Sequence, residues 1–470
     1  MSYSKGKRPY DHASRSSHHH IINNIEVREN LKNYQVPPND DSKLLNNAIQ
    51  KVEYTSSPIE HIISIDGGFT EIPISNGYPA ALLHFFQFGA LCFKVEDLKN
   101  LQNKKHISPA DMQKLKEISR VELALGTRGT KRKDCLSLKD SFRKELYEFF
   151  VKNKLGEDNN LLDTLKWFVF KQYKKTERED KDKVWFLSSN PNMVENGNGL
   201  YLKESEMKSD GTFKFDDDTV YLTDIFRLHE IIDEFSGATG TVSYVAGIIE
   251  HILAIHIIKN LLNKSPTFLS KVLFIMDRPT GWFGQTAICQ QLMFELINWL
   301  LAKHNIYLAG LEKSGAFVEY AMALQKRSLS NEKETIDDST SEDSDNSKEG
   351  FFPAQSILLL NDAIIYKYIS AGKEDPKRPY ASTSYYGHKV IFKSRLGRIH
   401  IVSVPVKELK KNPSIEDLPN LKTILGLIDF LHCDMYDNAL LPVALVNKLV
   451  SLSAHPSSKI LKNFANNTLP

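Results

Sequence analysis

Cysteine is scarce in this sequence, and its few copies are scattered. Only four of the 470 residues are cysteine: Cys92, Cys135, Cys289 and Cys433. No two of them form a CxxC pair, and no histidine stands at zinc-finger spacing from them. The sequence therefore predicts neither a disulfide framework nor a structural zinc site.

Long apolar runs are also missing. The longest such stretch, 248–262, is interrupted by polar side chains that include Glu250 and Lys259, so it is not expected to cross a bilayer. The N-terminal segment MSYSKGKRPYDHASRSS is basic but has no apolar core, unlike a secretory signal. We expect a soluble, cytoplasmic protein with no membrane partner.

Two common signatures of catalysis and nucleotide binding are absent as well. The glycine-containing segments 237–241 (GATGT) and 281–284 (GWFG) are not followed by the GK[ST] of a P-loop. No GxSxG nucleophile elbow occurs anywhere in the chain. The chain is therefore not expected to bind ATP itself or to act as a serine hydrolase of that kind.

What the sequence does contain is an uneven distribution of charge. The formal net charge is +2, but residues 328–350 include eight acidic and two basic residues, which leaves +8 for the rest. We expect 328–350 to be a disordered acidic loop. The positive remainder suits a polyanionic partner, although lysine-rich surfaces also serve solubility alone.

The order of apolar segments predicts an α/β fold. Runs rich in Ile and Phe that begin at Ile59 are typical of two or three antiparallel strands, and 95–235 is expected to be mainly helical, with one helix over 222–235. Segment 271–315 has the pattern strand, helix, strand, which implies parallel pairing. Two further strands within 388–406 and three C-terminal helices complete a mixed sheet flanked by helices.

Three parts are expected along the chain. The first, 1–55, is an N-terminal tail and lead-in segment; the second, 56–455, is a large α/β domain; the third, 456–470, is a C-terminal tail. The helical insertion 95–235 and the acidic loop 328–350 belong to the large domain.

Two aspartates stand at the ends of apolar strands. Asp66 follows the run 62–65 and precedes two glycines, which let a ligand approach closely, but DGG is also common turn chemistry. Asp277 closes the run 272–276, and ligands of parallel sheets gather at such carboxyl ends. The alternative for Asp277 is an N-cap or turn, because Pro279 and Gly281 follow.

A glutamate on an apolar helix face is the third unusual carboxylate. The helical neighbours of Glu250 are small or apolar, so its side chain is expected to point into packing. A buried glutamate needs a cation, and a structural pair with an arginine is the alternative to a metal. Asp66, Glu250 and Asp277 together could bind one or two divalent cations through oxygen.

Several basic residues are candidates for phosphate contacts. Lys313 ends a predicted strand and could hold a phosphate, although an exposed turn lysine is an equal alternative. The basic clusters 128–133 and 171–175 could follow a nucleic-acid backbone or be solvated surface charge.

The ordered motifs resemble the NurA nuclease family, in its larger bacterial form. The resemblance covers roughly Ile59 to Ser453, and the segments that carry it are SIDGGFTEIPI, LTDIFRLHEIIDEF with IIEHILAIH, FIMDRPTGWF, LAGLEKSGAF, ILLLNDAIIYKYI, RIHIVSVP and ALLPVALVNKL. No single motif is specific, so the order of the set carries the resemblance.

The resemblance implies a fold, an activity and partners. It implies a ribonuclease H-like core, cleavage of DNA that depends on Mn²⁺ or Mg²⁺, a homodimer, and docking onto a hexameric HerA-type ATPase that translocates DNA. The catalytic and metal-binding residues would be Asp66, Glu250 and Asp277. The resemblance also implies that this endo- or exonuclease would act in DNA end processing or in anti-phage defence.

The sequence departs from the family pattern near its C-terminus. The family often has a Tyr-Pro followed by a histidine in the last helix, but Leu441–Pro442 and Leu449 occupy these places. Asp437 or His432 could substitute as the fourth active-site group. The departure supports an alternative function, a catalytically weak or inactive structural subunit of an ATPase complex; a ribonuclease or resolvase is a third reading.

Overall fold

The computed structural model describes most of the chain in two compact units, Met1–Ser42 and Lys43–Pro470. The described residues are 18–34, 42–74, 81–102, 116–155, 159–174, 184–187, 200–215, 218–334, 352–370, 372–433, 439–452 and 456–469. In the first unit, α1 (His18–Asn23) and α2 (Ile25–Lys32) are short helices. The side chain of Asn24 caps α2 by accepting from the amide of Val27 at 3.2 Å.

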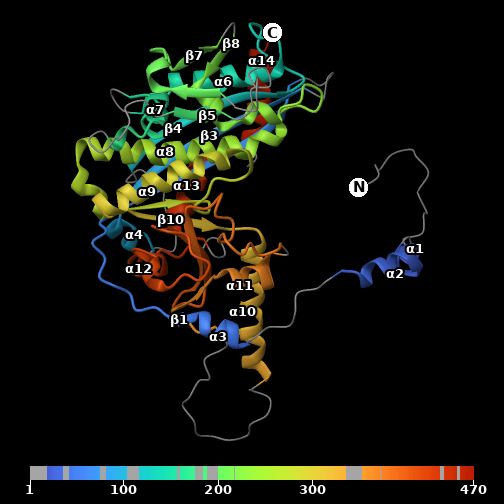
Figure 1. The fold of residues 1–470 in the computed structure, drawn as a ribbon, viewed down its shortest axis with the longest axis vertical. Coiled ribbons are helices and arrows are strands. Elements are labelled where there is room, and N and C mark those ends of the chain that lie inside the picture. The colour runs from blue at the N-terminus through green and yellow to red at the C-terminus, as the bar shows by residue number, and fades with distance from the viewer. Residues whose placement is uncertain are drawn as a thin grey trace, which may run out of the picture. The chain divides into compact units, whose positions relative to one another are not determined.

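A nine-stranded mixed sheet forms the centre of the second unit (Figure 1). Its order is β1-β11-β12-β13-β10-β9-β2-β3-β4. The neighbours β2, β9 and β10 are parallel, and all other pairs are antiparallel. The strands are β1 (Ile49–Lys51), β2 (His61–Pro73), β3 (Leu82–Lys94), β4 (Lys116–Arg128), β9 (Val272–Met276), β10 (Tyr307–Glu312), β11 (Ser356–Leu359), β12 (Gly387–Lys393) and β13 (Ile399–Pro405).

Helices cover both faces of the sheet. Alternate strand residues point to opposite sides, and apolar residues on both sides pack against helices. Ile63 and Ile65 of β2 belong to a core shared with α6 (Leu138–Lys152), α7 (Leu161–Val169), α8 (Val242–Lys264) and α9 (Gln290–His304). Ile62 belongs to a separate core shared with α4 (Val95–Gln102), α12 (Leu421–Phe430) and α13 (Leu441–Val450). A third core joins the β11–β13 region to α3 (Ser42–Ala48), α10 (Ala316–Glu334) and α11 (Asp362–Ile364). The prediction of an α/β sheet flanked by helices is confirmed, and its ribonuclease H-like character stays a prediction.

Helix α8 is apolar all round because it lies inside the protein. Residues 239–264 are long and apolar enough to cross a membrane by length and composition, but 89% of the most apolar window is buried in the protein. This is the pattern of a core helix. All four cysteines are free thiols.

The segment 95–235 differs from the mainly helical prediction. It contributes β4 to the sheet, where Val121, Leu123 and Leu125 are buried and the residues between them are exposed. It also forms two hairpins, β5 (Val184–Leu187) with β6 (Leu200–Lys203) and β7 (Thr212–Phe215) with β8 (Asp218–Tyr221). The helices within it are α4, α6 and α7, with single turns at Gln172–Lys174 and Glu204–Glu206.

The helix predicted over 222–235 is also absent. Two short 3₁₀ turns, Leu222–Phe226 and Leu228–Ile231, are separated by Arg227, whose φ of 58° interrupts a right-handed helix. The carboxylate of Asp224 caps the first of these turns, since it accepts from the amide of Tyr221 at 2.9 Å. Further short 3₁₀ helices are Thr239–Thr241, Pro266–Lys271, Gly284–Cys289 and Ile415–Asp417, and Ile365–Ile369 is a π-helix.

The later elements follow the prediction more closely. The parallel unit β9-α9-β10 is present, and α12, α13 and α14 (Ser457–Thr468) are the three C-terminal helices. The predicted tails join the body in part: β1 pairs with β11, and Phe464 of α14 packs its ring 6.4 Å from that of Phe85. Residues 328–334 continue α10, and 335–350 of the acidic loop lie outside the described residues.

Candidate active site

The site lies where the parallel pairing of three strands stops. Ile65 of β2 pairs with Met276 of β9, which pairs in turn with Gly310 of β10. The residues that follow, Asp66 and Asp277, therefore stand at the same edge of adjacent strands. Asp66 is not in a hairpin turn, because β2 continues past it and Asp66 itself pairs with Gly89 of β3.

Asp66 is buried among other carboxylates. Only 5% of the residue is exposed, and its Oδ1 accepts from the amide of Gly67 at 2.8 Å. Burial raises the pKa of Asp66 to about 7, and the nearby negative charges of Asp277 and Glu250 add to this rise. Among the described residues, no basic side chain forms an ion pair with Asp66. Asp66 therefore has no ion pair of its own in this part of the chain, although its negative charge also acts on the guanidinium of Arg278.

Glu250 reaches this end of the strands from α8, which packs on the face of β2 that carries Ile63 and Ile65. It is 3% exposed, and a Cβ atom on Gly67 would lie 2.9 Å from its Oε1, so the glycine makes room for the carboxylate. Its partner is Arg278, whose Nε donates to Oε2. Burial raises the pKa of Glu250, and Arg278 opposes that rise. The predicted alternative, a pairing with arginine, is what the structure contains.

Asp277 is paired with the predicted phosphate-binding lysine. The Nζ of Lys313 donates to Oδ2 of Asp277 at 2.6 Å. The side chains are unequally exposed, at 11% for Asp277 and 42% for Lys313. Lys313 can therefore turn toward solvent, or toward a ligand, while Asp277 stays in place. All four predicted site residues thus lie at one edge of the sheet.

Two hollows meet at Lys313. One has a volume of about 500 Å³ and is lined by Asp277, Arg278 and Lys313 together with aromatic side chains that include Trp282. The other, of about 270 Å³, is lined by Asn447 and Lys313 together with apolar side chains of α10, α13 and β13. Both are bordered by residues 311–313, so the end of β10 separates them. A chain-like substrate could pass along both.

Sequence reasoning missed Asn447 and Arg278. Asn447 of α13 donates from Nδ2 to Oδ2 of Asp66 at 3.0 Å, and it lies two residues before the residue aligned with the family histidine. That residue, Leu449, packs against the core of α12 and α13. His432 forms an isolated backbone bridge with Leu440, and Asp437 lies outside the described residues. Asn447 is exposed, and it is one of two polar residues in the apolar helix α13, which was the available signal for it.

A buried histidine lines the larger hollow as well. The Nδ1 of His251 lies 2.8 Å from the carbonyl oxygen of Gly247, and its Nε2 lies 3.3 Å from the hydroxyl of Tyr386. Burial lowers the pKa of His251 to about 3, so its imidazole is neutral at pH 7. Because both ring nitrogens have partners, His251 supports the wall of the hollow.

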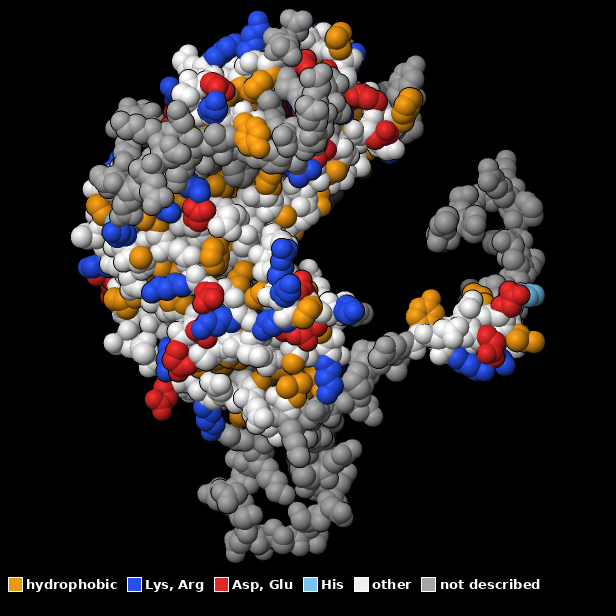
Figure 2. All heavy atoms as spheres, in the orientation of Figure 1, with side chains coloured by type: hydrophobic (Ala, Val, Ile, Leu, Met, Phe, Trp, Pro, Cys, Tyr) orange, Lys and Arg blue, Asp and Glu red, His pale blue; other side chains and the backbone are white. Residues whose placement is uncertain are grey.

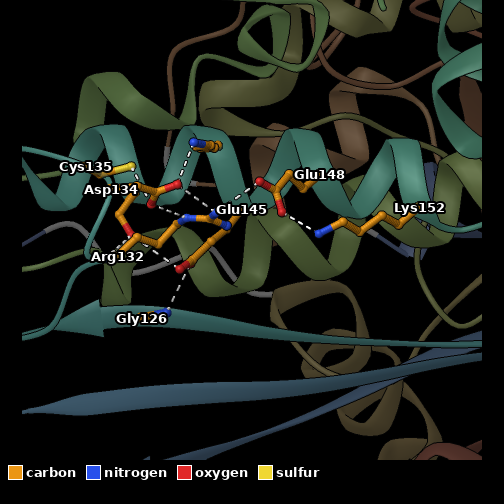
Figure 3. Close-up of polar contacts among 9 residues, drawn as sticks. Gly126, Arg132, Asp134, Cys135, Glu145, Glu148 and Lys152 are labelled. Carbon is orange, nitrogen blue, oxygen red and sulfur yellow. Dashed lines mark hydrogen bonds and ion pairs between the residues drawn. The ribbon is translucent and has the colours of Figure 1, made fainter. Parts of the chain in front are cut away.

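The two basic clusters take part in contacts within the chain. Arg132 pairs with Asp134 at 2.9 Å and with Glu148 at 3.0 Å, as Figure 3 shows. Lys171 pairs with Glu295 at 2.6 Å. On the face shown in Figure 2, basic and acidic side chains are interspersed. The contacts favour the structural alternative for Arg132 and Lys171.

The three carboxylates do not form a ready-made metal site. Within the described residues, no group of three His, Cys, Asp or Glu side chains is placed to hold a metal ion. The aspartates fit a divalent cation, because they are adjacent oxygen donors and Asp66 is buried with like charges. Glu250 does not fit as it stands, since Arg278 already occupies its carboxylate.

Comparison with known proteins gives a weak but consistent likeness. No protein-family model matches the chain, and no curated protein does. The NurA nuclease from Sulfolobus solfataricus aligns with 97% of this chain and 97% of its own, at 9% identity and a TM-score of 0.33. A NurA with manganese aligns at 12% identity and a TM-score of 0.28, over 97% of this chain and 99% of its own. A NurA bound to dAMP and manganese aligns at 13% identity and a TM-score of 0.25, over 97% of this chain and 98% of its own. Each of these three solved structures is a NurA nuclease, and the likeness of this chain to them is low.

Proposed function

We propose that this protein is a metal-dependent DNA nuclease that hydrolyses phosphodiester bonds. The observation that supports the proposal most is Asp66, a buried carboxylate whose pKa is raised by burial and by two nearby carboxylates, Asp277 and Glu250. Such crowding of negative charge is costly unless a cation or a positive substrate group relieves it. Perturbed carboxylates of this kind are typical of functional sites.

The residues of the site would have separate roles in binding the cation and the substrate. Asp66 and Asp277 would hold Mn²⁺ or Mg²⁺ through carboxylate oxygens, and Glu250 would complete the site once it is free of Arg278. The bound cation would activate a water and stabilise the leaving oxygen. Lys313 would exchange its contact with Asp277 for one with a substrate phosphate, because its side chain is the more exposed of the pair.

Asn447 would act as a positioning residue. Its amide donates to Oδ2 of Asp66, and the amide of Gly67 donates to Oδ1, so both oxygens are oriented from the protein side. Hydrogen bonds of this type fix the direction of metal-binding carboxylates. Asn447 would therefore orient Asp66 without supplying a titratable group, while Leu449 stands where the family resemblance gives a histidine.

The wider setting follows the family resemblance. The protein would act in the cytoplasm as a homodimer and would receive DNA from a hexameric HerA-type ATPase, either in DNA end processing or in anti-phage defence. No P-loop occurs in the sequence, so any ATP-driven movement of DNA would come from the partner.

The test is cleavage of linear and supercoiled DNA in Mn²⁺ or Mg²⁺, with wild type and Asp66→Ala, each with and without a HerA-type partner. We expect metal-dependent cutting that Asp66→Ala abolishes while the circular dichroism spectrum stays unchanged. Full activity of the purified variant would refute the assignment. RNA and junction substrates in the same assay separate a ribonuclease or a resolvase from a DNase.

A second candidate is a structural subunit that no longer cuts. The observation that favours it is the pairing of Glu250 with Arg278 and of Asp277 with Lys313, which leaves two of the three carboxylates already neutralised. Calorimetric titration with Mn²⁺ separates the two functions, since an inert scaffold has no reason to bind Mn²⁺ at Asp66. Assembly with the ATPase, without Mn²⁺ binding or cleavage, would favour this candidate.

A further inference from the structure

One arginine occupies the position where the carboxylate of Glu250 would meet a cation. The Nε of Arg278 pairs with Oε2 of Glu250, and the pair is largely inside the protein, with the glutamate side chain 3% and the arginine side chain 22% exposed. Arg278 has room there because Gly247, on the same helix as Glu250, has no side chain; a Cβ atom at that glycine would clash with the guanidinium. The pair is thus built into the packing of α8 against the end of β9.

An ion pair with a guanidinium and coordination of a divalent cation make the same demand on a carboxylate. Both use the lone pairs of its oxygens, and both bring positive charge close to them. The described residues contain no group of three His, Cys, Asp or Glu side chains that could hold a metal. Within the same part of the chain, Oε2 of Glu250 is bound to Arg278.

We propose that Arg278 competes with the divalent cation for Glu250. In this arrangement Asp66 and Asp277 hold the cation, and Glu250 joins them only when Arg278 withdraws. The inference rests on the proposed function, because it assumes that a divalent cation binds at Asp66. Arg278 also borders the 500 Å³ hollow that Lys313 lines, so its guanidinium has open space toward which to move.

The experiment measures the dissociation constant of Mn²⁺ by isothermal titration calorimetry at pH 8. Wild type is compared with Arg278→Gln, with Arg278→Lys, and with the double variant Arg278→Gln, Glu250→Gln. We expect Arg278→Gln to bind Mn²⁺ about tenfold more tightly, because one more carboxylate becomes available as a ligand. The gain should be absent in the double variant.

Arg278→Lys separates competition from a simple change of charge. It keeps the positive charge but loses the planar group that pairs through Nε, so any tightening in this variant cannot come from removal of charge. We expect a smaller gain than in Arg278→Gln. The lysine variant also keeps the experiment decisive if Arg278→Gln does not fold, as judged by circular dichroism.

The chain offers a matched control for loss of a buried ion pair. Arg143 and Asp224 form a pair at 2.6 Å, with side chains 21% and 3% exposed, nearly the same as in the Arg278–Glu250 pair. Arg143→Gln should leave the Mn²⁺ affinity unchanged. A gain in this control as large as that in Arg278→Gln would overturn the proposal, because the effect would then be general.

Two further outcomes keep this inference separate from the proposed function. If wild type binds Mn²⁺, Asp66→Asn abolishes binding, and neither Arg278 variant gains affinity, the competition is refuted and the metal site stands. If no variant, including wild type, binds Mn²⁺, the proposed function fails and the inference fails with it.

Discussion

Two carboxylates in this protein, the buried Asp66 and the partly buried Glu145, have similarly raised pKa values in different surroundings. The pKa of Asp66 and that of Glu145 are each raised to about 7, with burial as the main cause. Around Glu145, hydrogen bonds from the amide of Gly126 at 3.4 Å and the hydroxyl of Ser141 at 3.3 Å oppose the rise (Figure 3). Around Asp66, two further carboxylates add to it.

The difference lies in the surroundings more than in the pKa itself. The neighbourhood of Glu145 contains bases that pair with its other acids, since Arg132 and Lys144 both contact Asp134. At Asp66 the two bases are bound to Glu250 and Asp277, so the third carboxylate has no basic partner among the described residues. A raised pKa therefore marks a buried acid, and it is the crowding of like charges that indicates a cation site.

The largest expected effect separates these two acids directly. Asp66→Asn should lower the rate of metal-dependent DNA cleavage on the order of 10³-fold or more, because an amide is a poor ligand for a hard cation. Glu145→Gln makes the same chemical change at a structural position and should keep the rate within about twofold of wild type. Equal losses in the two variants would remove the distinction between the sites.

The lysines of the two neighbourhoods provide the next comparison. Lys313→Ala should lower cleavage about 10- to 100-fold, since a phosphate-binding cation is lost at the site. Lys144→Ala removes a lysine that also pairs with an aspartate at 2.6 Å, and it should leave cleavage unchanged. Steady-state kinetics with a fluorescent oligonucleotide would measure both, and an unaffected Lys313→Ala enzyme would exclude Lys313 from substrate binding.

Asn447 tests whether orientation of Asp66 matters. Asn447→Leu removes the hydrogen bond to Oδ2 and should weaken Mn²⁺ binding or cleavage about tenfold, as expected for a residue behind a metal ligand. Asn447→Gln retains the amide and should recover part of the loss. A leucine variant with wild-type Mn²⁺ affinity and wild-type rate would show that Asn447 serves packing only.

The positions of the aspartates could be predicted from the sequence because the signal was local. The apolar run that stops at Asp277 indicates the end of β9, and the parallel pairing of β9 with β2 stops at the same level, after Ile65. The strand end expected at Asp66 was wrong, because β2 continues to Pro73. The partners of these residues could not be predicted in the same way. Asn447 is far from Asp66 in the sequence, and the pairing of Arg278 depends on which face α8 turns toward the sheet.

The segment 95–235 was misjudged for a related reason. Its charged residues suggested solvated helices, but on β4 they alternate with Val121, Leu123 and Leu125, which is the period of an edge strand with one buried face. Within 222–235, Arg227 adopts a left-handed conformation that single-residue propensities do not indicate. Tertiary contacts, such as the pair of Arg143 with Asp224, decide the local structure there.

The smallest expected effect concerns the contribution of Glu145 to stability, which can be measured apart from that of the proposed metal ligands. Its pKa is raised from 4.5 to about 7, so the folded state binds more protons than the unfolded state between these pH values. The free energy of unfolding should therefore fall as pH rises through this window, by about 1–3 kcal/mol. Glu145→Gln removes the titrating group, so it should be more stable than wild type at pH 8 and nearly equal to it at pH 5. Urea denaturation at the two pH values measures this, and the difference at pH 8 should persist when Mn²⁺ is added, because Glu145 is not expected to bind the cation. A Glu145→Gln gain that is the same at both pH values would assign the effect to packing rather than to charge.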